Sequence, residues 1–136
     1  MSSLEAAVGR AQLERLDELI EARQRNAAYY RERLGDVVEF LKEQPYARAV
    51  CWMFGILLRD RDTREGLMQF LAGRDIETRA FFLPMNRQPV YKSDQALPVA
   101  EDLGQRGLYL PSASHLSDQD KDTVIQAVRE YLTGRR

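Results

Sequence analysis

The sequence is poor in the residues that most often carry chemistry. It has one cysteine, Cys51, and one histidine, His115, among 136 residues. A lone cysteine cannot form an internal disulfide, so a reducing compartment, the cytoplasm, is expected. Metal ligation needs His, Cys or carboxylate side chains clustered at ligand spacing, and the sequence shows no such cluster. We therefore expect no metal site.

A charge excess of one sign is also missing. The sequence has 20 Lys and Arg residues and 21 Asp and Glu residues, which gives a net charge of −1. Binding to nucleic acid or to an anionic membrane requires a strong basic excess, so neither is expected as a partner. No apolar run approaches the roughly 20 residues of a membrane-spanning helix. The start, MSSLEAAVGR, lacks the basic and then apolar pattern of a signal peptide.

The composition that remains is typical of a globular protein. The chain is 44% hydrophobic and 30% charged. Its length suits one domain with its own core, and no internal repeat or low-complexity segment interrupts it. We therefore expect residues 1–136 to form a single domain.

A long amphipathic helix is predicted at the beginning of the chain. Ser2 and Glu5 have the spacing of a capping box, and apolar residues then recur at helical spacing as far as Leu34. Gly35 is placed to end this helix. A helix of about 30 residues is roughly 45 Å long. Because that is long for a domain of this size, we expect part of it to pack on something outside the chain.

The rest of the sequence predicts a small sheet with helices packed on it. Residues 49–58 (AVCWMFGILL) are apolar on both faces, which indicates a central strand with Trp52 in the core. The other predicted elements are strands at 37–41, 76–82 and 107–111, and helices at 62–73, at 98–103 and after Ser117. This order of elements predicts an α/β or α+β fold of two layers.

The residues alone do not form a catalytic constellation. His115 lies among serines, but a hydrolase also needs a positioned nucleophile and a third, orienting group. We interpret His115 as a loop or capping residue. A catalytic lysine needs a pKa lowered by burial or by a neighbouring cation, and the surroundings of Lys42, Lys92 and Lys121 predict neither.

Residues 78–91 (TRAFFLPMNRQPVY) form an unusually aromatic and proline-rich connection. Arg79 and Phe81 share one face of the strand that leads into it. Arg79 is either a solvated strand residue or a clamp for an anionic substrate, because a guanidinium offers fixed bidentate donors. Phe82 lies on the opposite face and is expected in the core, where its replacement by Ala would cost about 3 kcal/mol or more. Asn86 and Gln88 are expected at loop positions that tolerate Ala at under about half a kcal/mol.

Three blocks of the sequence, in order, resemble the C-terminal portion of the DegT/DnrJ/EryC1/StrS family. SSLEAAVGRAQLERLDELIEARQRNAAYYRERL resembles the long helix that begins TNLQAA in the family. DIETRAFFLPMNRQPVY resembles the family pattern GIxTRxxFxPxHxQPxY, and LPVAEDLGQRGLYLPSASHLSDQDKDTVIQAVREYL resembles its closing segment. Members are fold-type-I aminotransferases that depend on pyridoxal phosphate and act on sugars, and the resemblance covers nearly the whole chain.

The resemblance implies the small domain of such an enzyme. The full-length enzyme would move an amino group, from glutamate, to a keto-sugar nucleotide, in amino-sugar, cell-surface polysaccharide or antibiotic-sugar biosynthesis. Its pyridoxal phosphate would act as the electron sink. In the family the loop after the TR strand lies over the mouth of the active site, which implies substrate-binding roles for Arg79, Phe81, Asn86, Gln88 and Tyr91. The small domain would also cover the cofactor cleft and support a homodimer.

Several departures from the family pattern limit this expectation. Asp75 stands in place of the usual Gly, Ala80 in place of Pro, and Asn86 in place of the frequent His, so Asn86 cannot act as an acid or base. The Schiff-base lysine, the aspartate that faces the pyridine nitrogen and most phosphate ligands belong to a large domain that this sequence lacks. We therefore expect no catalytic and no cofactor-binding residue here, and no activity of the chain alone.

The position of Met1 leads to a further expectation. It corresponds to an internal position of the family, which suggests a truncated product, a misplaced start or a fragment. Without the large domain, Leu4 and Val8 should form an exposed apolar stripe through which the chain self-associates. Two alternatives stay open: a non-catalytic binding or assembly module, and a remnant without function.

Overall fold

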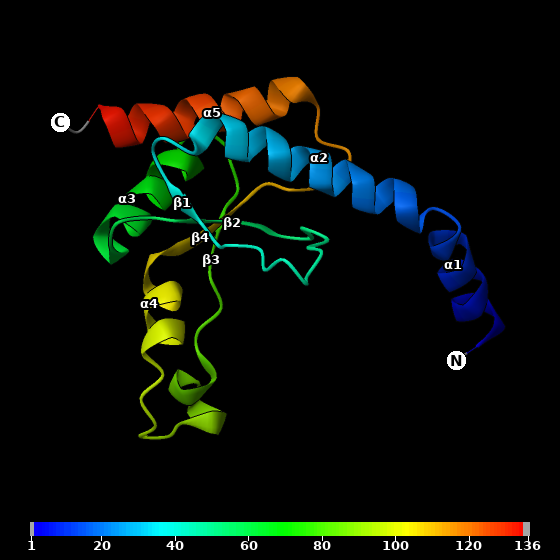
Figure 1. Ribbon diagram of the computed structural model, residues 1–136, viewed down its shortest axis with the longest axis horizontal. Helices are drawn as coiled ribbons and strands as arrows, with labels where there is room; N and C mark the ends of the chain where they lie inside the picture. Colours follow the sequence, from blue (N-terminus) through cyan, green and yellow to red (C-terminus); the bar gives the residue numbers. More distant parts are fainter. Residues whose placement is uncertain (1, 135–136) are drawn as a thin grey trace.

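The computed structural model describes residues 2–134 and contains a small antiparallel sheet with helices on one face (Figure 1). This mixed α+β architecture confirms the predicted fold class. The elements in chain order are α1 (Ser3–Leu13), α2 (Leu16–Leu34), β1 (Glu39–Phe40), β2 (Phe54–Leu57), α3 (Arg61–Ala72), β3 (Arg79–Ala80), η1 (Met85–Arg87), η2 (Pro89–Tyr91), α4 (Pro98–Arg106), β4 (Gly107–Leu110) and α5 (Asp118–Thr133).

The four strands are ordered β1-β2-β4-β3, and every neighbouring pair is antiparallel. The strand β2 lies inside the sheet, as predicted, but it is shorter than residues 49–58. Cys51 has a φ of 50°, a left-handed conformation that is uncommon for a residue other than glycine and that interrupts the extended backbone. Beyond this interruption the alternation is lost, and Trp52 is 63% exposed. The prediction that Trp52 lies in the core is therefore wrong.

One face of the sheet builds the hydrophobic core. Ile56 of β2 and Leu108 of β4 are fully buried beneath α2, α3 and α5. In Figure 1 α2 and α5 run side by side above the sheet, with α3 next to α5. Tyr30 of α2 stacks on the Phe54 ring at 5.1 Å, and its hydroxyl donates to the Pro111 carbonyl at 3.0 Å. These contacts couple the long helix directly to the two central strands.

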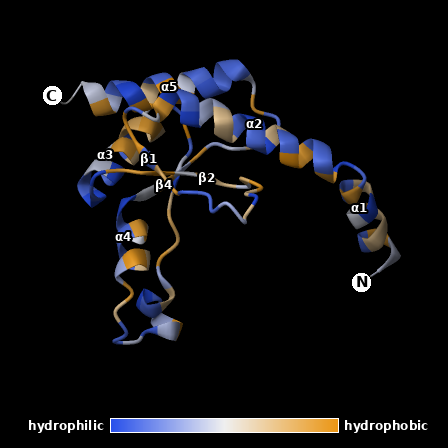
Figure 2. Cartoon of the chain, viewed as in Figure 1, coloured by the Kyte–Doolittle hydropathy of each residue, from blue (hydrophilic) through white to orange (hydrophobic). Residues whose placement is uncertain are grey.

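The predicted first helix is in fact two helices. The chain breaks at Glu14 and Arg15, where the Arg15 N–H donates to the Gln12 carbonyl at 3.2 Å in a tighter turn. Sharp breaks are usually caused by Pro or Gly, and neither stands here, so the apolar periodicity did not indicate this one. The helix α1 buries none of its residues although it carries hydrophobic ones, and it points away from the sheet (Figures 1 and 2).

The starts of α3, α4 and α5 lie close to the predicted capping signals. Asp60, not Asp62, caps α3: its carboxylate accepts from the Thr63 N–H at 2.8 Å, and this bond lowers the pKa of Asp60. Pro98 begins α4 and Ser117 caps α5, both as predicted. No helix in residues 2–134 is both long and apolar enough to cross a membrane, and no three metal-binding side chains gather in that range.

The other face of the sheet is covered by Phe81. The ring lies over Gly55 of β2 and Gly107 of β4, and it stacks on Tyr109 with 4.3 Å between ring centres. A Cβ atom at Gly55 would lie 2.5 Å from Phe81 Cζ. The two glycines therefore provide the space in which an aromatic ring lies flat on the sheet. Phe81 is the first residue after β3, so the packing of its ring on Gly55 and Gly107 fixes the point at which the loop leaves the sheet.

Replacement of Gly55 by Ala should lower the free energy of unfolding by about 1–3 kcal/mol, because the new methyl group must displace the Phe81 ring. Gly9→Ala is the control, since nothing lies within 4 Å of a Cβ at that position, and it should not destabilise the protein. Urea unfolding followed by circular dichroism measures the free energy of unfolding of both variants. Equal stability of Gly55→Ala and the natural chain would contradict this packing role.

Candidate functional site

The loop after β3 is folded rather than open. It forms the two short 3-10 turns η1 and η2, and in Figure 1 it projects from the sheet and returns along α4. Within it the Arg87 N–H donates to the Pro84 carbonyl at 2.9 Å, and the Tyr91 N–H to the Gln88 carbonyl at 3.0 Å. A Cβ at Gly104 of α4 would lie 2.9 Å from the Pro84 ring, so the loop packs closely on α4.

Asn86 lies at the centre of this loop and is 4% exposed. Its Nδ2 donates to the Gln95 carbonyl at 2.9 Å and to Glu101 Oε1 at 2.7 Å. Because both partners are acceptors, the orientation of the amide is determined. Its Oδ1 is buried without a partner among the described residues. The expectation that Asn86 occupies a tolerant loop position is therefore wrong: it holds the loop together.

Glu101 of α4 completes this arrangement, which we call the Glu101 clamp (Asn86, Arg87 and Glu101). Its Oε2 accepts from Arg87 Nη2 at 2.9 Å, and its Oε1 accepts from Asn86 and from the Leu97 N–H. The Arg87 guanidinium and then the Asn86 amide lower the pKa of Glu101. At neutral pH the carboxylate is therefore ionised and ties the centre of the loop to α4.

The remaining predicted site residues have different surroundings. Arg79 is exposed on β3, with its guanidinium 5.0 Å from the centre of the Phe82 ring. Tyr91 is 58% exposed in η2. Gln88 is half-buried, and its Nε2 donates to the Leu83 carbonyl at 3.0 Å. Arg79 and Tyr91 thus present their side chains to solvent, whereas Phe81, Asn86 and Gln88 make contacts within the fold.

Phe82 differs from its expected place. It is 51% exposed and touches the sheet only at its edge, 5.8 Å from the Tyr109 ring centre. The strand β3 is only two residues long, so the alternation that would bury Phe82 has already ended. Of the residues on its predicted face, Ile76 is buried. The expected large cost of Phe82→Ala rested on burial, and that premise is wrong.

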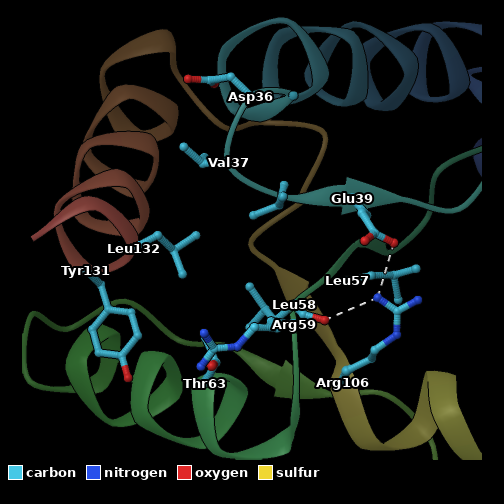
Figure 3. A pocket seen from close by; sticks show the side chains of 12 residues that line it. Asp36, Val37, Glu39, Leu57, Leu58, Arg59, Thr63, Arg106, Tyr131 and Leu132 are labelled. Atoms are coloured by element: carbon cyan, nitrogen blue, oxygen red, sulfur yellow. Dashed lines mark hydrogen bonds and ion pairs between the residues drawn. The ribbon is translucent and has the colours of Figure 1, made fainter. Parts of the chain in front are cut away.

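A hollow of about 770 Å³ lies on another side of the molecule (Figure 3). Its lining is mixed: apolar residues such as Val37, Leu57 and Leu132 alternate with charged and polar ones. Arg106 Nη1 donates to Glu39 Oε2 and to the Leu58 carbonyl, each at 3.2 Å. The Arg106 guanidinium is therefore held by partners within the fold.

A second hollow, of about 400 Å³, lies against the loop itself. Three arginines line it, and we call it the arginine hollow: Arg61 and Arg64 from α3, and Arg87 from η1. The sequence analysis did not single out Arg61 or Arg64. Arg61 lies just before the predicted helix 62–73; in the observed α3 the two residues are three apart, which places both on one face.

The fold is shared with known enzymes. The model of the DegT/DnrJ/EryC1/StrS aminotransferase family matches residues 1–129, and the chain belongs to this family. It is 35% identical over 136 residues to a GDP-perosamine synthase of Escherichia coli O157:H7, which covers 99% of this chain and 37% of that protein.

Solved structures agree with this assignment. A DegT DnrJ EryC1 StrS aminotransferase from Brucella abortus is 31% identical with a TM-score of 0.85, over 97% of this chain and 36% of that one. DesV of S. venezuelae, solved with a ketimine intermediate, is 30% identical with a TM-score of 0.85, over 96% of this chain and 36% of that one. The chain spans little more than a third of the length of the relatives it matches.

The lysines of this chain do not fit the family's cofactor, pyridoxal phosphate, which is held by a lysine Schiff base. Lys42 and Lys92 are exposed outside helices and strands. Lys121 is 5% exposed, but its Nζ pairs with Asp118 Oδ1 at 2.7 Å and donates to Asn26 Oδ1 at 3.1 Å between α2 and α5. An amine engaged in this way has no access to a carbonyl, so its role is to link two helices.

Asn86→Ala should lower the free energy of unfolding by about 1–3 kcal/mol, because Glu101 and the Gln95 carbonyl lose a buried donor. Gln88→Ala is the matched control: it removes an amide from the same loop that makes one bond and is less buried. This control should lower the free energy of unfolding by only about 0.5 kcal/mol. The midpoints of urea unfolding test the difference, and equal shifts for the two variants would exclude the clamp.

Proposed function

We propose that this chain forms the C-terminal part of an aminotransferase that moves an amino group, from glutamate, to a keto-sugar nucleotide. The observation that carries the proposal is the match of nearly the whole chain to sugar aminotransferases. Three of these relatives, at 34% to 36% identity, are GDP-perosamine synthases, which favours a guanosine diphosphate sugar as the substrate. The single cysteine suits the cytoplasm, where we place the reaction.

The loop after β3 would contribute one wall of the sugar-nucleotide pocket. Arg79 and Tyr91 present a guanidinium and a phenol outward, and these groups are suited to an anionic or hydroxylated ligand. Phe81, Asn86 and Gln88 position the loop that carries Tyr91. The unpaired Oδ1 of Asn86 also remains an acceptor that a ligand hydroxyl could use. The proposed direct contacts therefore narrow to Arg79, Tyr91 and this one oxygen.

The remaining parts of the reaction would come from the large domain of the family. When bound there, pyridoxal phosphate supplies the electron sink for amino transfer. The lysines described above fit no such role, which also supports a non-catalytic binding or assembly module as the second candidate for the chain alone. Translation of the DNA upstream of Met1 separates the two candidates, because only the first requires an in-frame large domain with a Schiff-base lysine.

The chain alone should show no aminotransferase activity and no stoichiometric lysine labelling after treatment with pyridoxal phosphate and borohydride. Joined to its large domain, Arg79→Ala should lower kcat/KM by on the order of tenfold while leaving the melting temperature of the 136-residue chain unchanged. Gln126→Ala, an exposed change on α5, serves as the control. Labelling of one lysine together with turnover by the chain alone would refute the proposal.

We also propose that the chain self-associates through α1. Leu4 and Val8, one turn apart on the same face of α1, are 76% and 57% exposed, and exposed apolar surface favours association. Sedimentation velocity of the natural chain should show a dimer or larger species. The double variant Leu4→Glu, Val8→Glu should sediment as a monomer. A monomer of the natural chain at high protein concentration would count against this arrangement.

A further inference from the structure

The lining of the arginine hollow contains three arginines and one carboxylate, that of Glu101. Glu65 Oε1 accepts from Arg61 Nε at 2.7 Å and from Arg64 Nη2 at 3.1 Å, and Glu101 Oε2 accepts from Arg87 Nη2 at 2.9 Å. The three guanidinium groups share two carboxylates as hydrogen-bond partners, and Asp62 also lies close enough to Arg61 to raise its pKa. Both oxygens of Glu101 already accept hydrogen bonds, so this carboxylate is shielded from an approaching anion.

Arg64 shows that these groups are more than a solvated surface cluster. It is 9% exposed, and its Nη1 donates to the Gly104 carbonyl at 3.3 Å. Its Nε is buried and has no partner among the described residues. Buried N–H donors in folded proteins are nearly always paired. A buried guanidinium with an unused donor, in the lining of an arginine-rich hollow, is suited to an acceptor from a ligand.

We propose that the arginine hollow binds a phosphate group of a small metabolite. Guanidinium groups match the geometry of phosphate oxygens and bind them in bidentate fashion. Each guanidinium has five N–H donors, and the bonds of Arg61 and Arg87 use only Nε and Nη2, respectively. The residues Phe81, Leu83 and Pro84 give the hollow an apolar side for the uncharged part of such a ligand. Its volume is also that of a small-molecule site.

This inference does not rest on the proposed function, because the hollow lies entirely within the described chain. It also lies apart from Arg79 and Tyr91, which do not line it. If the aminotransferase proposal failed, the phosphate-site proposal would still hold. If the phosphate-site proposal failed, the family assignment would not change.

Isothermal titration with inorganic pyrophosphate, at constant ionic strength and neutral pH, tests the proposal on the 136-residue chain. Binding should saturate at one pyrophosphate per chain, and Arg61→Gln should weaken it by about tenfold, the loss of one charge-assisted hydrogen bond. Arg25→Gln is the matched control. Arg25 pairs with Glu21 on α2, and its side chain is 68% exposed against 66% for Arg61, so affinity should not change.

GDP, which carries the same diphosphate on a nucleoside, separates the two sources of phosphate. Tighter binding of GDP than of pyrophosphate identifies a nucleotide ligand, and equal binding identifies the bare phosphate group; both outcomes support the site. Arg87→Gln provides a second variant and should weaken binding as Arg61→Gln does. Absence of saturable binding would overturn the proposal. Equal weakening by Arg61→Gln and Arg25→Gln would do so too, because it would indicate general charge attraction only.

Discussion

The antiparallel pairing of β2 with β4 is the interaction on which the rest of the structure depends. On one face, Ile56 and Leu108 bury themselves under three helices. On the other, Gly55 and Gly107 leave the room that the Phe81 ring fills. The same pair of strands therefore supports the hydrophobic core and anchors the start of the candidate loop. Packing and the candidate site are coupled through a single aromatic ring.

The loop adds a second layer of organisation to this anchor. Glu101 draws Asn86 and Arg87 onto α4, and Pro84 packs against Gly104. A loop held by a buried amide and an ion pair keeps its shape before any ligand arrives, so binding does not have to order it. The arginine hollow uses the same frame, since Arg87 belongs both to the clamp and to its lining.

Local signals in the sequence predicted those parts of the fold that depend on local rules. Pro98, Ser117 and Gly73 mark helix ends because capping involves only neighbouring residues, and the structure has each of them in place. The break at Glu14 and the exposure of Trp52 were not predictable in this way. The first has no Pro or Gly to announce it, and the second follows from the positive φ of Cys51.

The candidate site shows the same division. The composition of residues 78–91 indicated a rigid loop, and the structure has one. The sequence could not show that Asn86 is buried, because its partners Gln95 and Glu101 lie 9 and 15 residues further along the chain. Arg61 and Arg64 were equally out of reach, since their closeness to Arg87 arises only when α3 packs on α4.

The Glu101 clamp has a consequence for how such a domain can diversify. It buries Asn86 and most of Glu101, and it leaves Val90 and Tyr91 of η2 85% and 58% exposed. Exposed positions away from such contacts tolerate substitution with little change in stability. New side chains at these two positions can therefore alter what the loop recognises while its backbone stays the same, so selection could retune specificity without rebuilding the scaffold.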